Sequence, residues 1–223
     1  MSINVAIDGP AGAGKSTIAR MLARELNYIY VDTGAMYRAM ALYMIEHKID
    51  VSHLDEVGSA CDAITIDIQY SAGEQQVILN GKNVNDFIRT ETVSEMSSKI
   101  SAIPEVREKL LSLQRSLAAA ENVIMDGRDI GTHVLPNADV KIFLTADAHV
   151  RAVRRYEEFI AKGVSCTLEN VEREVIERDE RDMNRAIAPL KKAEDAVRVD
   201  TSAMTIEEVV CYLKNLIGQA VAR

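Results

Sequence analysis

The chain has 223 residues, 48% of them hydrophobic, which is enough for one sizeable core and a small appended lobe. Its net charge of −8 makes nucleic acid an unfavourable main partner. The first ten residues, MSINVAIDGP, contain no basic region and no long apolar run. We therefore expect a cytoplasmic protein without a secretion signal or a membrane-spanning segment.

The basic residues are mostly arginine and are unevenly distributed. Sixteen of the 26 basic residues are arginine, and many lie between residues 128 and 185. Arginine suits the recognition of phosphate groups through two parallel hydrogen bonds. An acidic protein with such a cluster predicts a small phosphorylated ligand held in a cleft. The cysteines and histidines have no metal-ligand spacing, so we expect free thiols rather than a metal centre.

In chain order, residues 3–27 predict a strand, a glycine-rich loop and a helix. A second strand is expected at 28–31 and a second helix from about residue 35. Residues 62–84 instead alternate apolar and polar side chains, which predicts an antiparallel hairpin and a short edge strand. This island interrupts a regular strand–helix alternation, so we expect an inserted lobe here. The helices expected after it span 89–103 and 105–120.

The strand–helix alternation resumes in the second half of the chain. Asp147 is the expected N-cap of a helix that ends near Gly163. Five short apolar strands separated by helices indicate an α/β fold. We expect a five-stranded parallel sheet flanked by helices, with an inserted small antiparallel lobe and a short lid. The remaining elements are strands at 123–126, 140–146 and 196–202, a charged helix that runs to 187, and a closing helix at 206–221.

The stretch GPAGAGKST matches the phosphate-binding pattern G-x-x-x-x-G-K-[ST] in full and lies between a predicted strand and a predicted helix. Glycines allow backbone N–H groups to surround phosphate oxygens, and the helix N-terminus adds positive potential. Lys15 is expected to bridge the β- and γ-phosphates of ATP, and Ser16 to place its hydroxyl on Mg²⁺. The predicted ATP-binding residues are Gly9, Pro10, Ala11, Gly12, Ala13, Gly14, Lys15, Ser16 and Thr17.

This loop identifies only the phosphate donor, because GTPases, motor ATPases and small-molecule kinases all use it. The chain has no N-K-x-D guanine motif and is short for a motor domain. A kinase is therefore favoured, and a kinase needs a second site for its acceptor. Two alternatives stay open: a kinase for another acceptor such as UMP or shikimate, and a nucleotide-binding regulator that does not turn ATP over.

The stretch MDGRDIG, residues 125–131, ends a predicted strand with two carboxylates and an arginine. Asp126 stands where a Walker B carboxylate supports the magnesium shell. Arg128 and Asp129 follow a glycine and can project over the carboxyl edge of the sheet, where ligands bind in open α/β folds. The alternative is a local Arg–Asp pair that stabilises the turn.

Two further stretches predict contacts with an acceptor. VDTGAMYR places Thr33, Tyr37 and Arg38 at a sheet edge and a helix start, where arginine is unfavourable against the helix dipole. In ERDERDMNR, the apolar stripe of the preceding helix continues into charged residues instead of ending. For both stretches the alternative is ordinary solvated surface charge. The charged residues that continue the stripe are Arg178, Asp182 and Arg185, with Arg181 beside them.

The stretches GPAGAGKST, DTGAMYR, DGRDIG and RDERDMNRAIAPL, in this order, resemble the bacterial cytidylate kinases, the CMP/dCMP kinases of the nucleoside monophosphate kinase family. The resemblance runs essentially from end to end and includes the inserted lobe. It implies phosphorylation of CMP and dCMP by ATP, with Mg²⁺, in pyrimidine nucleotide metabolism. It also implies a monomer. The implied regions are a core of 1–34, 104–150 and 186–223, an NMP-binding lobe of 35–103 and a lid of 151–185.

The resemblance implies a role for each matching residue in the acceptor site. Arg38, Arg128 and Arg185 bind the CMP phosphate, while Arg178 and Asp182 hold the ribose hydroxyls.

The residues that the resemblance assigns to the base are Ser98, Arg107 and Asp129, with Thr33 nearby. Many relatives have serine where this chain has Thr33, and Ser97 is an alternative to Ser98. The alternative for Arg107 is an ordinary surface charge on a helix.

The chemistry of cytosine fits this assignment independently. A carboxylate such as Asp129 can accept from the N4 amine, and Arg107 can donate to N3 and O2. Uracil reverses this pattern, so its O4 would face a carboxylate without a proton to share. A polar site built for one base rejects the other strongly.

The acceptor is already an anion, so we expect no general base, and catalysis by positioning and charge stabilisation. Closure of a lid would exclude water and suppress ATP hydrolysis. The candidate lid arginines are Arg151, Arg154 and Arg155. The expected catalytic residues are Lys15, Arg128, Arg154 and Arg185.

Overall fold

The computed structural model describes residues 2–161 and 163–221. Its centre is a five-stranded sheet in the order β2-β6-β1-β7-β8, in which every neighbouring pair is parallel. The predicted parallel sheet is therefore confirmed. Its strands are β1 (Asn4–Asp8), β2 (Ile29–Asp32), β6 (Val123–Gly127), β7 (Val140–Thr145) and β8 (Val197–Asp200).

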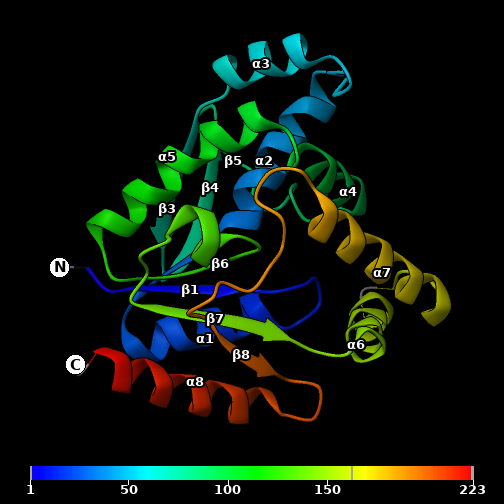
Figure 1. Cartoon of the computed structure of the whole chain (residues 1–223). Coiled ribbons are helices and arrows are strands. Elements are labelled where there is room, and N and C mark those ends of the chain that lie inside the picture. Colours follow the sequence, from blue (N-terminus) through cyan, green and yellow to red (C-terminus); the bar gives the residue numbers. More distant parts are fainter. Residues whose placement is uncertain (1, 162, 222–223) are drawn as a thin grey trace.

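Helices cover both faces of this sheet (Figure 1). On one face, Leu22 of α1 and Leu213 of α8 share a buried cluster with the strands. On the other face, Met40 of α2 and Leu110 of α5 belong to a second buried cluster. The sheet is thus buried on both sides, which parallel sheets require. The helices are α1 (Lys15–Leu26), α2 (Thr33–Glu46), α3 (Leu54–Ala63), α4 (Glu91–Ile100), α5 (Pro104–Ala120), α6 (Ala148–Ala161), α7 (Leu168–Asn184) and α8 (Ile206–Val221).

The inserted lobe is a separate antiparallel sheet, as predicted. Its hairpin turns at Ala72 and Gly73, whose φ angles of 52° and 79° suit a two-residue hairpin turn. Gln75 docks the lobe on the main sheet, because its side-chain amide accepts from Asp32 N at 2.8 Å and donates to Asp32 O at 3.2 Å. This pairing covers part of the edge strand β2. The strands of the lobe are β3 (Ile66–Ser71), β4 (Glu74–Leu79) and β5 (Lys82–Asn83).

Two elements in the first half differ from the prediction. Helix α2 begins at Thr33 rather than near residue 35, because the Asp32 side chain caps it by accepting from Ala35 N at 2.8 Å. Helix α3 was not predicted at all. The acidic residues of its first turn, Asp55 and Glu56, are a helix-start signal that could have indicated it.

Helix α7 is shorter than predicted. It ends at Asn184 rather than at 187, because Arg185 has an extended backbone with ψ of 141°. The chain then turns back, and Leu190 N donates to Asp182 O at 2.8 Å. This reversal carries Arg185 off the helix axis, so the residue belongs to a loop rather than to a helix face.

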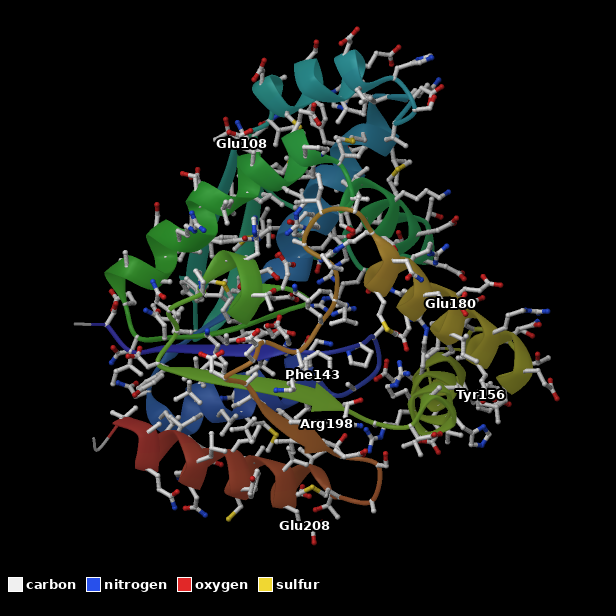
Figure 2. The ribbon with its side chains drawn as sticks, viewed as in Figure 1. Glu108, Phe143, Tyr156, Glu180, Arg198 and Glu208 are labelled. Atoms are coloured by element: carbon white, nitrogen blue, oxygen red, sulfur yellow. The ribbon has the colours of Figure 1, made fainter. Side chains whose placement is uncertain are left out.

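Helices α6 and α7 pack together beyond the carboxyl end of β7, outside the layers that cover the sheet (Figure 1). Asp147 caps α6 as predicted, since its carboxylate accepts from His149 N at 2.9 Å. Figure 2 labels Tyr156 on α6 and Glu180 on α7. No helix in the described parts of the chain is both long and apolar enough to cross a membrane.

Candidate active site

A cleft of about 680 Å³ lies at the carboxyl edge of the sheet. Ten arginine and lysine side chains line it, against five aspartates and glutamates. Among the predicted ATP-binding, CMP-binding, magnesium-binding and catalytic residues, all except Gly9 and Pro10 line this cleft. Stretches far apart in the sequence therefore meet in one positively charged site, which suits a phosphorylated ligand.

The P-loop, residues 9–17, has a backbone that only small residues allow. A Cβ atom added to Gly9 would lie 1.9 Å from the carbonyl oxygen of Leu144, so the close approach of the loop to β7 requires glycine. Gly14 precedes α1 in the left-handed conformation, with φ of 81°. Glycine has no side chain to cap the helix, so the first N–H groups of α1 are available to a phosphate.

Lys15 is buried in this loop, and its Nζ donates to the carbonyl oxygen of Pro10 at 2.6 Å. Burial, and then the nearby Arg128, lower the pKa of Lys15 well below its ordinary value. An anionic ligand beside Lys15 would favour the charged ammonium again, so the site is electrostatically prepared for phosphate.

Asp126 connects the P-loop with the end of β6. Its carboxylate accepts from Ser16 Oγ at 2.8 Å and from the Tyr30 hydroxyl at 3.0 Å. Burial, and then the neighbouring Asp32, raise the pKa of Asp126 to about 6. A hydroxyl and a buried carboxylate side by side are oxygen ligands of the kind that Mg²⁺ prefers, and a cation would relieve the repulsion between the two carboxylates.

Asp32 organises the start of α2. Besides capping the helix, its carboxylate accepts from Arg38 Nη2 at 2.9 Å and lies 3.5 Å from Arg89 Nη2. Although burial opposes it, the two arginines lower the pKa of Asp32. Arg38 is thereby held at the cleft, in the second turn of α2 rather than the first. Arg89 also lines the cleft but was not predicted, because it lies outside every motif.

Asp129 is the centre of a buried ion-pair network. Arg107 Nη2 contacts its Oδ2, and Arg185 Nη2 donates to its Oδ1 at 3.1 Å. Arg107 is only 5% exposed, so the alternative of a surface charge is wrong. Its guanidinium also lies over the ring of Tyr37, 5.9 Å from the centroid. The chain thus brings together residues 37, 107, 129 and 185 as predicted.

The two serine candidates both line the cleft. The Ser98 hydroxyl is buried and has no hydrogen-bond partner within residues 2–161 and 163–221, which leaves it free for a ligand. Thr33 differs, because its Oγ1 donates to the carbonyl oxygen of Asp126 at 2.7 Å. The threonine hydroxyl therefore ties the start of α2 to β6 in this structure.

Helix α7 presents Asp182 and Arg178 to the cleft, as its sequence pattern predicts. Arg128 Nε donates to Asp182 Oδ2 at 2.8 Å. Burial, and then the charge of Arg128, lower the pKa of Arg178 to about 10. Arg178 Nε has no partner in the described part of the chain. Arg181 is exposed and does not line the cleft.

The three candidate lid arginines have different surroundings. Arg154 and Arg155 line the cleft, and Arg154 Nη2 donates to Thr201 O at 2.8 Å. Arg151 is buried and fixed instead. It donates to Ala11 O at 2.9 Å and lies 2.6 Å from Asp179 Oδ2, which ties the P-loop to α7. Arg151 therefore has a structural position behind the cleft.

Asp8 and Gln75 were also missed, although both are buried polar residues next to the site. Asp8 ends β1 immediately before the P-loop, and a charged residue in a buried strand is a signal that could have been noticed. Gln75 gives no such signal, because polar residues alternate along its hairpin.

Comparison with known proteins identifies the family. The family model described as "Cytidylate kinase" matches residues 5–219. A cytidylate kinase of Carboxydothermus hydrogenoformans is 51% identical over 219 residues, which are 97% of this chain and 98% of that protein. One of Lactobacillus johnsonii is 48% identical over 215 residues, 96% of this chain and 94% of that protein.

Among solved structures, an uncharacterized protein from Eubacterium ventriosum is similar with a TM-score of 0.52 at 15% identity. It covers 98% of this chain and 99% of its own, and this likeness shows the fold alone. The matches in sequence extend over nearly the whole chain and include the four motifs that meet in the cleft. The chain therefore belongs to the cytidylate kinase family.

Proposed function

We propose that the chain transfers the γ-phosphoryl group of ATP to the 5′-phosphate of CMP and dCMP, giving CDP and dCDP. The observation that carries the proposal is the buried network in which Arg107 and Arg185 hold Asp129, in the same cleft as a complete P-loop. This arrangement supplies a donor site, an acceptor-phosphate site and a base-selective carboxylate together.

In the donor half, the N–H groups at the start of α1 and the Lys15 ammonium bind the β- and γ-phosphates. Ser16 and Asp126 would hold Mg²⁺, which neutralises the phosphate charge when bound. In the described residues, no group of three or more His, Cys, Asp and Glu could hold a metal ion. The Ser16 hydroxyl as ligand, with Asp126 supporting the magnesium shell indirectly, fits a cation that keeps waters and takes its other ligands from ATP.

In the acceptor half, Arg38, Arg128 and Arg185 bind the CMP phosphate and orient it for in-line attack. Arg178 and Asp182 bind the ribose. Because the attacking oxygen is already anionic, no side chain has to remove a proton. Catalysis then consists of alignment and of stabilising the charge that develops on the transferred group, with Arg154 at the rim of the cleft.

The base is selected by Asp129 and Arg107, with Ser98 beside them. A carboxylate offers about four acceptor positions, and the two arginines use one on each oxygen. An acceptor position therefore remains for the N4 amine of cytosine. Uracil offers O4 there, and two acceptors facing each other in a buried site are strongly unfavourable.

Acceptor-dependent ADP release from ATP and Mg²⁺ tests this proposal, with CMP, dCMP, UMP, AMP and shikimate offered separately. We expect high turnover with CMP and dCMP and little with the others. Equal turnover with UMP would contradict the role of Asp129 and Arg107. ATP binding without any acceptor-dependent ADP release would instead indicate a regulator.

We further propose a division of labour along the chain: a core of 1–34, 104–150 and 186–223, an NMP-binding lobe of 35–103 and a lid of 151–185. Family resemblance supports this division, a cytoplasmic setting and a monomer. Light scattering coupled to gel filtration tests the last point, and a mass of twice the chain would contradict it.

A further inference from the structure

Asp8 is a buried carboxylate that the proposed chemistry does not use. It is the last residue of β1 and is only 4% exposed. Both of its oxygens accept backbone N–H groups: Oδ1 from Ile130 at 2.8 Å, and Oδ2 from Gly131 at 2.7 Å. These amides lie 122 and 123 positions away in the sequence, so the contact is made by the tertiary fold.

The two amides open a short π-helix, Ile130–Val134, which follows directly on Asp129. The first N–H groups of a helix have no partner within the helix and need an acceptor. The usual acceptor is the side chain of the N-cap residue, and aspartate is among the residues most favoured there. Asp129 occupies the N-cap position, yet its side chain makes no cap hydrogen bond in this fully described segment.

Asp8 therefore performs the capping that Asp129 would otherwise perform. The Gly131 amide is one of those that an N-cap aspartate normally binds, and Asp8 Oδ2 already occupies it. As a result, the Asp129 carboxylate turns away from its own helix and accepts from the guanidinium groups of Arg107 and Arg185.

We propose that Asp8 is a positioning residue for base recognition: by capping the helix after Asp129, it keeps the Asp129 carboxylate available to cytosine. This inference rests on the proposed function. Without the Asp8 carboxylate, the Asp129 side chain gains a competing role as its own helix cap. The Asp129 carboxylate then occupies less often the position in which it accepts from the N4 amine of cytosine.

The test is the ratio of kcat/KM for CMP to kcat/KM for UMP, in the wild type and in Asp8→Asn. The asparagine amide loses one acceptor and sets an N–H group against a backbone N–H group. We expect the ratio to fall about tenfold or more, since a small misplacement of a binding group is costly. The ratio does not depend on how much of the enzyme is folded, so reduced stability alone does not change it.

Asp8→Ser is the second variant, because it removes both carboxylate oxygens that accept from Ile130 N and Gly131 N, and it adds no amide. Asp139→Asn is the matched control. Asp139 also accepts a backbone N–H group of β1, from Asn4 at 2.7 Å, but at the opposite end of the strand. We expect this control to keep the wild-type ratio.

An unchanged ratio in both Asp8 variants, with a selective wild type, would overturn this inference and leave the proposed function standing. A wild type that does not prefer CMP over UMP would overturn the proposed function, and this inference with it. A lower ratio in the Asp8 variants and an unchanged ratio in Asp139→Asn is the expected result.

Discussion

The two halves of the cleft are built in different ways. The proposed donor half is one contiguous stretch, residues 9–17, which offers backbone amides and a single lysine to a phosphate. The acceptor half collects side chains from α2, α4, α5, α7 and the segment after β6. Its charged groups hold one another in pairs, such as Arg128 with Asp182 and Arg185 with Asp129.

This difference separates two ways of making a phosphate site. The backbone amides of the donor half are positioned by the loop and by α1, with a tie to α7 through Arg151. Paired side chains are held by one another, so the acceptor half depends on residues outside it, such as Asp8 and Gln75. We therefore expect substitutions in the donor half to change the kinetic constants for ATP, and substitutions in the acceptor half to change those for CMP.

The largest effect is expected from Lys15→Ala, which removes the only positively charged side chain of the donor half, residues 9–17. Loss of a positioned charge in a water-excluded site lowers kcat by about 10²–10³-fold. Steady-state ADP release with saturating CMP measures this. Lys214→Ala is the control, since Lys214 lies outside the lining of the cleft and pairs with Glu25 at the surface at 2.8 Å. A Lys15 variant with unchanged kcat would contradict the donor assignment.

Asp129→Asn instead removes the carboxylate that is proposed to recognise the base in the acceptor half. We expect kcat/KM for CMP to fall about 10–100-fold, the range of a good base-specific contact, while kcat/KM for UMP falls less or rises. The KM for ATP should stay near the wild-type value. Asp195→Asn is a matched control, because this exposed carboxylate lies outside the lining of the cleft and pairs with Lys141 at 2.8 Å. Equal losses with both bases would mean that Asp129 only supports the fold.

The pH dependence of the free energy of unfolding tests the environment of Asp8, which lies between the two halves. Burial raises the pKa of Asp8 from its ordinary 3.8 to about 6, so the folded protein holds this proton more tightly than the unfolded chain. Its contribution to the free energy of unfolding is therefore full below pH 4 and is lost as the pH rises to about 6.

A difference of about two pH units corresponds to at most about 3 kcal/mol. Urea unfolding between pH 4 and pH 7 measures it, with Asp8→Asn as the reference that cannot titrate. We expect the wild type to lose stability relative to the variant as the pH rises through this range. Parallel curves for the two proteins would contradict the raised pKa.

The smallest effect is expected from Gln75→Leu, which leaves the Asp32 backbone N–H and C=O buried without their partner. The loss in unfolding free energy should be about 1–3 kcal/mol. Because Asp32 holds Arg38, the KM for CMP should rise several-fold while the KM for ATP does not. Gln76→Leu is the control on the same strand, since the side-chain hydrogen bonds of Gln76 in the described residues go to Glu74, Asn83 and Asn85. Equal changes in both KM values would show that the lobe supports the whole cleft.

The sequence alone predicts the residues of the donor site, because these nine residues are consecutive and act mainly through the backbone. It also determined the five parallel strands and the acceptor motifs, since buried strands and a helix stripe that turns charged leave local patterns. The predicted binding residues of these motifs line one cleft, apart from Gly9 and Pro10.

The support of both halves of the cleft becomes visible only in the folded chain. Asp8 caps a helix 122 positions away, Gln75 reaches Asp32 across 43, and Arg151 binds the P-loop carbonyl of Ala11 across 140. Such contacts join residues that are far apart in the sequence. Each contact forms because the fold places two buried polar groups close enough to form a hydrogen bond. No local sequence pattern predicts such a contact.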